Sequence, residues 1–118
     1  MPYPQQALET LLWSSIVGNQ HADLFEPSQE LKDRVGDDFA RFEDMLEEAM
    51  PDFDVVEDCK TECDEFEQLE HDFILTVNGH GAGFWDGDWE SGDDLTEICE
   101  RFRKLEVYKG DDNLLYPF

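Results

Sequence analysis

Residues 28–50 read SQELKDRVGDDFARFEDMLEEAM and carry the most regular pattern in the chain. Apolar side chains recur there at steps of four and three, at Leu31, Val35, Phe39, Phe42, Leu46 and Ala49. This spacing places them on one face of a helix, and acidic side chains fill most of the positions between them. Because Ser28 is a good N-cap and Pro51 cannot continue a helix, the pattern predicts one long helix over residues 29–50.

Helical spacing also occurs on both sides of this segment. Residues 4–17 place apolar side chains on one helical stripe that stops at Gly18, which predicts a first helix. After a connection over residues 18–27 and the long helix, residues 54–69 keep helical spacing with acids in the gaps. They predict a third helix whose outer face is acidic.

The pattern changes at residue 71. Apolar residues then alternate up to Asn78-Gly79, the strongest short signal for a hairpin turn, so we expect strands over residues 72–77 and 80–85. Asp94 and Glu97 resemble a capping pair, which predicts a short helix over 94–102. Strands over 105–108 and 114–116 follow, separated by a turn.

The predicted order is three helices followed by β-β-α-β-β. It indicates an α+β fold in which N-terminal amphipathic helices pack on a small antiparallel sheet. The 118 residues suit a single domain, 1–118, with an acidic helical half (1–70) and a β-rich half (71–118). We expect a cytoplasmic chain, because no apolar run is long enough for a membrane span and the start lacks the basic flank of a signal peptide.

Charge is the strongest functional signal. The net charge is −23, and residues 23–72 alone contain 20 acidic residues against four basic ones. Nucleic-acid backbones and anionic membranes bind Lys and Arg, so direct contact with either is disfavoured. The electric field of this negative charge attracts basic surfaces. The commonest large basic surfaces belong to nucleic-acid-binding proteins. Solubility and adaptation to high salt are two further explanations of the acidity that stay open.

The two acidic helices place carboxylates in rows, because residues three and four apart are neighbours on a helix. We expect these residues to bind a basic partner: Asp37, Asp38, Asp44, Glu47, Glu48, Asp58, Glu62 and Glu65. Trp85 and Trp89 are predicted as aromatic anchors of the same interface. The resulting hypothesis is a non-enzymatic binding protein that imitates DNA charge and inhibits a basic, nucleic-acid-binding protein. The pattern indicates no oligomeric state.

Three strings in the C-terminal half carry a resemblance. They are HDFILTVNGHGAGFWDGDW at 71–89, GDDLT at 92–96 and YKGDD at 108–112. Together they resemble a family of small uncharacterised proteins from phages and bacterial genomes, over residues 71–116 and only in outline over the acidic helices. The resemblance implies a phage-type protein that acts on a host protein, and it transfers no site residue.

Two metal hypotheses are weaker. Cys59 and Cys63 could share zinc with His71 or His80, but the usual C-x2-C spacing is missing and reduced core thiols are favoured. The acids of residues 86–97 occupy positions of a calcium loop, at Asp86, Asp88, Glu90, Asp94 and Glu97. Ser91 replaces the required glycine, which excludes an EF-hand, while weak divalent binding stays open.

Catalytic readings have little support. The glycines of residues 79–83 lack the basic neighbour and the helix start that a phosphate cradle needs. His80 with Asp86 or Asp88 could act as a general base, but no nucleophile spacing accompanies it. We therefore expect no enzyme and no cofactor. The alternatives are a metal-binding or structural interaction module and, less favoured, a small hydrolase.

Overall fold

The computed structural model describes residues 4–62, 64–79 and 82–118. Their helices are α1 (Gln5–Ser14), α2 (Gln29–Ala49), α3 (Val55–Asp58), α4 (Glu65–Asn78) and α5 (Gly92–Cys99). Their strands are β1 (Ile16–Val17), β2 (Gln20–His21), β3 (Glu26–Pro27), β4 (Val107–Lys109) and β5 (Leu114–Pro117). Two 3-10 turns, η1 (Ala22–Leu24) and η2 (Phe84–Asp86), complete the order. The predicted α+β class is confirmed.

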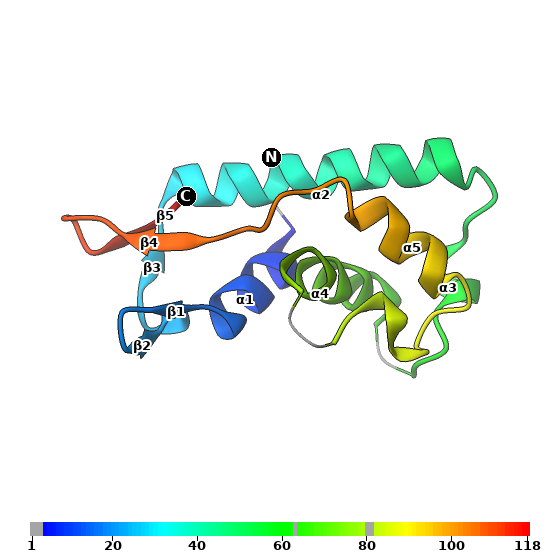
Figure 1. Cartoon of the computed structure of the whole chain (residues 1–118), viewed down its shortest axis with the longest axis horizontal. Coiled ribbons are helices and arrows are strands. Elements are labelled where there is room, and N and C mark those ends of the chain that lie inside the picture. The colour runs from blue at the N-terminus through cyan, green and yellow to red at the C-terminus, as the bar shows by residue number, and fades with distance from the viewer. Residues whose placement is uncertain (1–3, 63, 80–81) are drawn as a thin grey trace.

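The molecule is elongated, with extents of 45 × 26 × 23 Å. Helix α2 runs along its length, α1 and α4 lie beneath it, α3 and α5 lie at one end, and the strands gather at the other (Figure 1). Strands β4 and β5 pair antiparallel, as predicted, and β3 adds to β5 in parallel. The β1–β2 hairpin was not predicted: β1 replaces the end of the predicted first helix, and β2 lies in the segment that was predicted to be a plain connection. Each helix in the described ranges is too short or too polar to cross a lipid bilayer.

Five phenylalanines form the centre of the core. The Phe42 and Phe73 ring centroids are 4.7 Å apart, and the Phe73 and Phe102 rings meet edge to face at 5.3 Å. Phe39 and Phe84 join the same cluster. Aromatic pairs in these arrangements add stabilisation beyond the burial of apolar area. The cluster therefore holds together α2, α4, η2 and the segment after α5.

The helices predicted N-terminal to residue 51 are confirmed with small changes of length. Helix α2 ends one residue early, at Ala49, and the Ser28 Oγ accepts a hydrogen bond from the Leu31 amide at 3.1 Å, as an N-cap should. Helix α1 ends at Ser14, after which the chain enters β1. The predicted burial of the apolar face of α2 is confirmed from Leu31 to Leu46.

The predicted third helix over 54–69 is wrong as one element. It is divided into the single turn of α3 and the start of α4, with Cys63 outside the described residues. The Asp64 carboxylate accepts hydrogen bonds from the backbone amides of Phe66 and Glu67, both at 3.0 Å. Asp64 is therefore an N-cap, and it begins a new helix within the acidic run.

The predicted strand over 72–77 is also wrong, because these residues form the second half of α4. Their alternation is misleading since Phe73, Ile74, Leu75 and Val77 are all buried. A short run that is apolar on every side does not distinguish a strand from a buried helix. Gly79 has φ 62°, ψ 42° and closes α4 as a left-handed cap, so it does not form a hairpin turn.

The predicted second strand over residues 80–85 is also wrong for those of its residues that the structure describes. Residues 80 and 81 lie outside the described residues, and Phe84–Asp86 form η2 instead of a strand.

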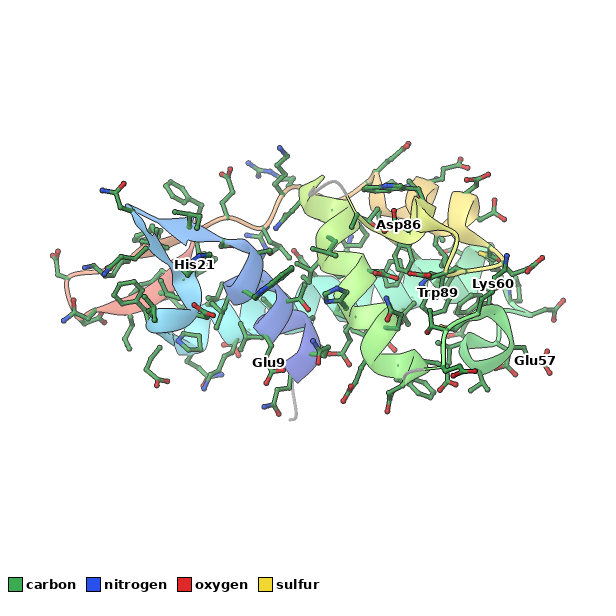
Figure 2. The ribbon with its side chains drawn as sticks, turned by 90° about the horizontal axis from the view of Figure 1, so that it is seen from below. Glu9, His21, Glu57, Lys60, Asp86 and Trp89 are labelled. Carbon is green, nitrogen blue, oxygen red and sulfur yellow. The ribbon has the colours of Figure 1, made fainter. Side chains whose placement is uncertain are left out.

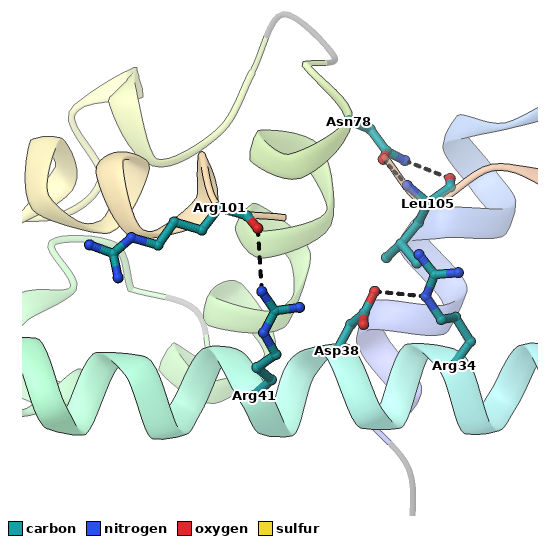
Figure 3. A network of polar contacts seen from close by, with 6 residues as sticks. All are labelled: Arg34, Asp38, Arg41, Asn78, Arg101 and Leu105. Atoms are coloured by element: carbon teal, nitrogen blue, oxygen red, sulfur yellow. Dashed lines mark hydrogen bonds and ion pairs between the residues drawn. The ribbon is translucent and has the colours of Figure 1, made fainter. Parts of the chain in front are cut away.

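The Asn78 side-chain amide forms two hydrogen bonds with the backbone of Leu105. Its Oδ1 accepts from the Leu105 amide at 2.8 Å, and its Nδ2 donates to the Leu105 carbonyl at 3.2 Å (Figure 3). The chain consequently enters β4 only at Val107, two residues later than predicted.

Candidate functional site: an acidic end

Two acidic segments meet at one end of the molecule. Residues 43–62 and 86–100, which we call the acidic end, contain 16 of the 31 acidic residues and a single basic one, Lys60. The segments are joined backbone to backbone, because the Lys60 amide donates to the Asp88 carbonyl at 2.7 Å and the Glu90 amide to the Asp58 carbonyl at 2.9 Å. Figure 2 shows Glu57, Lys60 and Asp86 towards this end, far from His21.

Asp58 helps to hold the two segments together. Its carboxylate accepts hydrogen bonds from the Ser91 amide at 3.0 Å and from the Ser91 hydroxyl at 2.6 Å. The Lys60 ammonium lies 3.4 Å from the Glu90 carboxylate, but both side chains are mostly exposed, so this ion pair contributes little stability. Asp58 therefore has a structural role, although it was predicted to bind a partner.

Trp89 anchors the second segment in the core. It is only 2% exposed, and its indole Nε1 donates a hydrogen bond of 2.7 Å to the Asp72 carboxylate. Gln68 donates to the same oxygen at 2.9 Å, and the Trp89 ring packs on Phe53 and Phe84. The prediction that Trp89 is an exposed interface residue is wrong. An indole needs a partner for its N–H when buried, and Asp72 supplies it.

The other predicted binding residues differ in accessibility. Asp37, Asp44, Glu47, Glu48 and Glu62 are exposed, and Trp85 is 43% exposed. Asp38 and Glu65 are half-buried. The Arg34 Nε lies 3.0 Å from the Asp38 carboxylate, so that charge is already partly neutralised. Five carboxylates and one aromatic side chain of the predicted set are thus fully available to a partner.

Sequence reasoning missed the acids of the second segment as binding residues. Six of them are exposed and belong to the acidic end: Asp86, Glu90, Asp93, Asp94, Glu97 and Glu100. The available signal was local composition, because residues 86–100 hold seven acids and no basic residue. Gly92 allows this segment to pack closely, since a Cβ at that position would collide with the Phe84 carbonyl oxygen.

Seven of the eight basic residues lie outside the acidic end, and Arg101 borders it. Four of the eight follow α5, at Arg101, Arg103, Lys104 and Lys109. Arg41 donates to the Arg101 carbonyl at 3.4 Å (Figure 3), and its guanidinium lies 4.6 Å from the centre of the Phe102 ring. Arg34 is paired with Asp38 in the same region. The charge is therefore separated along the molecule as well as large in total.

Burial raises the pKa of three carboxyl groups, those of Asp72, Glu43 and Glu70. Burial raises the pKa of Asp72, and hydrogen bonds from Gln68 and Trp89 oppose the increase. The pKa of Glu43 is raised by burial and by the negative charges of Glu70 and Asp44. The pKa of Glu70 is raised by burial in turn. Burying these three carboxyl groups costs stability, because each shift disfavours the charged form in the folded state.

Acidification from pH 7 towards the ordinary carboxyl pKa, about 4, is therefore expected to raise Tm. The pKa of Asp72 is higher in the folded protein than in the unfolded chain, so stability falls as pH rises through that interval and is regained on acidification. Thermal denaturation across this pH range is the measurement. Asp72→Asn removes the titrating group and should show a smaller rise, while Asp37→Asn, an exposed site, should keep nearly all of it. An equal rise in Asp72→Asn and the parent would contradict the assignment.

The metal hypotheses gain no support from the described residues, among which no group of three potential ligands could hold an ion. Cys63 and His80 of the proposed zinc set lie outside them. His71 Nδ1 is 2.8 Å from the Thr10 hydroxyl, and Asp86 accepts a hydrogen bond from the Gly83 amide at 3.1 Å. His80, the proposed general base, also lies outside the described ranges.

Comparisons with protein-family models, with curated proteins and with solved structures find no match to this chain.

Proposed function

We propose that this chain is an acidic, non-enzymatic binding protein whose acidic end docks onto a basic surface of a nucleic-acid-binding protein. One observation carries the proposal: the fold joins two separate segments so that 16 acids and one lysine share one end of an elongated molecule. Like charges brought together in this way repel each other and reduce stability. A function that uses this concentrated negative charge would explain why the fold retains it despite the loss of stability.

The chemistry of such a surface favours a partner that normally binds DNA. Duplex DNA presents about one negative charge per 1.7 Å of its axis, and its binding proteins match it with rows of Lys and Arg. Exposed carboxylates on α2, on residues 50–62 and on α5 offer negative charge to such rows. A net charge of −23 also attracts a basic partner from a distance and speeds association.

On this proposal the protein inhibits its partner by occupying the surface that DNA uses. This role agrees with the phage-type origin that the resemblance implies, and on this proposal the protein acts in the cytoplasm of a host cell. Docking needs no cofactor and no chemical step, since charge complementarity supplies both steering and specificity.

The test is capture followed by DNA competition. The chain is immobilised, exposed to nuclease-treated bacterial lysate, and eluted with a short DNA duplex at constant ionic strength; polyglutamate beads of equal charge serve as the control. We expect the immobilised chain to capture nucleic-acid-binding proteins. The DNA duplex should release these proteins, and the polyglutamate beads should not retain them. Retention of the same proteins by both beads, with release by salt and not by DNA, would show that the acidity acts only as a general polyanion.

A further inference from the structure

A hollow of about 230 Å³ lies between the C-terminal half of α2 and α5. The apolar residues of its lining are Met45, Ala49, Met50 and Ile98. The charged residues of its lining are two acids, Asp94 and Glu97, and one arginine, Arg101. We call these seven residues the α2–α5 groove. The groove therefore lies at the border of the acidic end, and its lining is partly apolar and partly charged.

The groove exists because the apolar stripe of α2 extends beyond the core. Phe42 and Leu46 are buried, whereas Ala49, the next member of the stripe, is exposed. Ala49 has no side chain beyond Cβ to fill the space towards α5, and Met45 is only half-buried. The last turn of α2 thus has part of its apolar face uncovered.

The chemistry of the groove differs from that of the surrounding surface. Methionine side chains are flexible and polarizable, so Met45 and Met50 can adapt to ligands of different shape. Asp94 and Glu97 are three residues apart on α5, which places them side by side on one edge of the groove. Arg101 repels a cation from its own side, so a bound cation is directed towards the two carboxylates.

We propose that the α2–α5 groove binds one large apolar side chain from a basic amphipathic helix of the partner. Lys or Arg residues of that helix flank the apolar side chain and pair with Asp94 and Glu97. A cavity of about 150 Å³ holds a benzene ring, so 230 Å³ has room for a leucine or an aromatic side chain. This inference rests on the proposed function and adds to it: the surface selects basic segments that carry an apolar anchor.

The probes are two synthetic helical peptides of equal charge, one of Lys and Leu and one of Lys and Ser. Affinity is measured by fluorescence anisotropy at two salt concentrations. The chain has three methionines, and two of them line the groove, so 13C-methyl methionine NMR reports occupancy directly. We expect the Lys-Leu peptide to shift the Met45 and Met50 methyl signals and to bind at least tenfold more tightly than the Lys-Ser peptide.

Two alanines of α2 give a matched pair of variants. Ala49→Trp fills the groove without changing charge, whereas Ala40→Trp adds the same ring at an exposed position of the same helix, outside the groove. Ala49→Trp should lower the affinity for the Lys-Leu peptide about ten- to hundredfold. It should leave the affinity for the Lys-Ser peptide and the salt dependence of binding unchanged. Ala40→Trp should bind both peptides as the parent does.

The outcomes separate the groove from the general charge effect. If both peptides bind equally with silent methionine methyls, or if Ala49→Trp binds as the parent does, the groove inference is overturned while docking by charge stands. If neither peptide binds at low salt, the groove inference and the proposed function both fail. Preferential binding of the Lys-Leu peptide that Ala49→Trp abolishes supports both.

Discussion

Phe73→Ala is expected to lower the free energy of unfolding by about 3–5 kcal/mol, the range for a fully buried phenylalanine. Phe73 is 0% exposed, and its ring lies 4.7 Å from that of Phe42, 5.3 Å from Phe102 and 5.6 Å from Phe39. These partners come from α2 and from the segment after α5, so the substitution loosens three parts of the core together. A domain of this length has a total stability of roughly 6–18 kcal/mol, so the loss is a large fraction.

Phe66→Ala is the matched control for this prediction. Phe66 lies on the same helix, α4, and is 60% exposed. Its substitution should change the free energy of unfolding by no more than about 0.5 kcal/mol. Urea denaturation of both variants, followed by circular dichroism, measures the difference. Equal destabilisation by the two substitutions would show that the phenylalanine cluster is not the centre of the core.

The sequence predicts α2 well because several independent signals agree there. The apolar spacing, the Ser28 cap and the break at Pro51 all favour the same helix, and the structure buries the predicted face from Leu31 to Leu46. Agreement between local signals of this kind is what makes an element predictable. The β4–β5 pair is similar, since a turn separates two short apolar runs.

Residues 71–79 were mispredicted because their local signals fit two structures. Asn78-Gly79 suits a hairpin turn, but a glycine after an apolar run is equally typical of a helix end. Tertiary contacts decide between the two readings. Helix α4 packs between α1 and the η2–α5 region, so it needs apolar side chains on several faces. No periodicity within nine residues reveals these neighbours.

The candidate site was predictable only in part for the same reason. The carboxylates of α2 follow from its helical pattern, and Asp37, Asp44, Glu47 and Glu48 are exposed as expected. The acidic end as a whole depends on pairing of residues 58–60 with residues 88–90, a contact distant in sequence. The buried position of Trp89 depends on the partner Asp72 from another element.

Neutralising exposed acids on α2 is expected to weaken partner binding by about 1–3 kcal/mol, roughly five- to 150-fold. The variant changes Asp37, Asp44, Glu47 and Glu48 together to Asn or Gln. All four side chains are exposed, and Asn and Gln differ little from Asp and Glu in helix propensity. Removing four like charges lowers repulsion in the folded state, so the melting temperature should stay equal or rise.

The control removes the same charge at the other end of the molecule. It changes Asp23, Glu26, Glu106 and Asp111, which are all exposed near the strands. The two variants therefore have equal net charge and differ only in where charge is lost. Binding to a DNA-releasable partner is compared by surface plasmon resonance at two salt concentrations, because screening weakens exposed contacts.

Location of charge should decide the result. The α2 variant should associate more slowly and depend less on salt, because exposed charges at the rim of an interface act mainly on the association rate. The control should lose much less affinity, since its charges act only from a distance and salt screens them. Equal losses in the two variants would indicate that net charge alone matters. Unchanged affinity in both would contradict charge mimicry and direct attention to the exposed Trp85 ring.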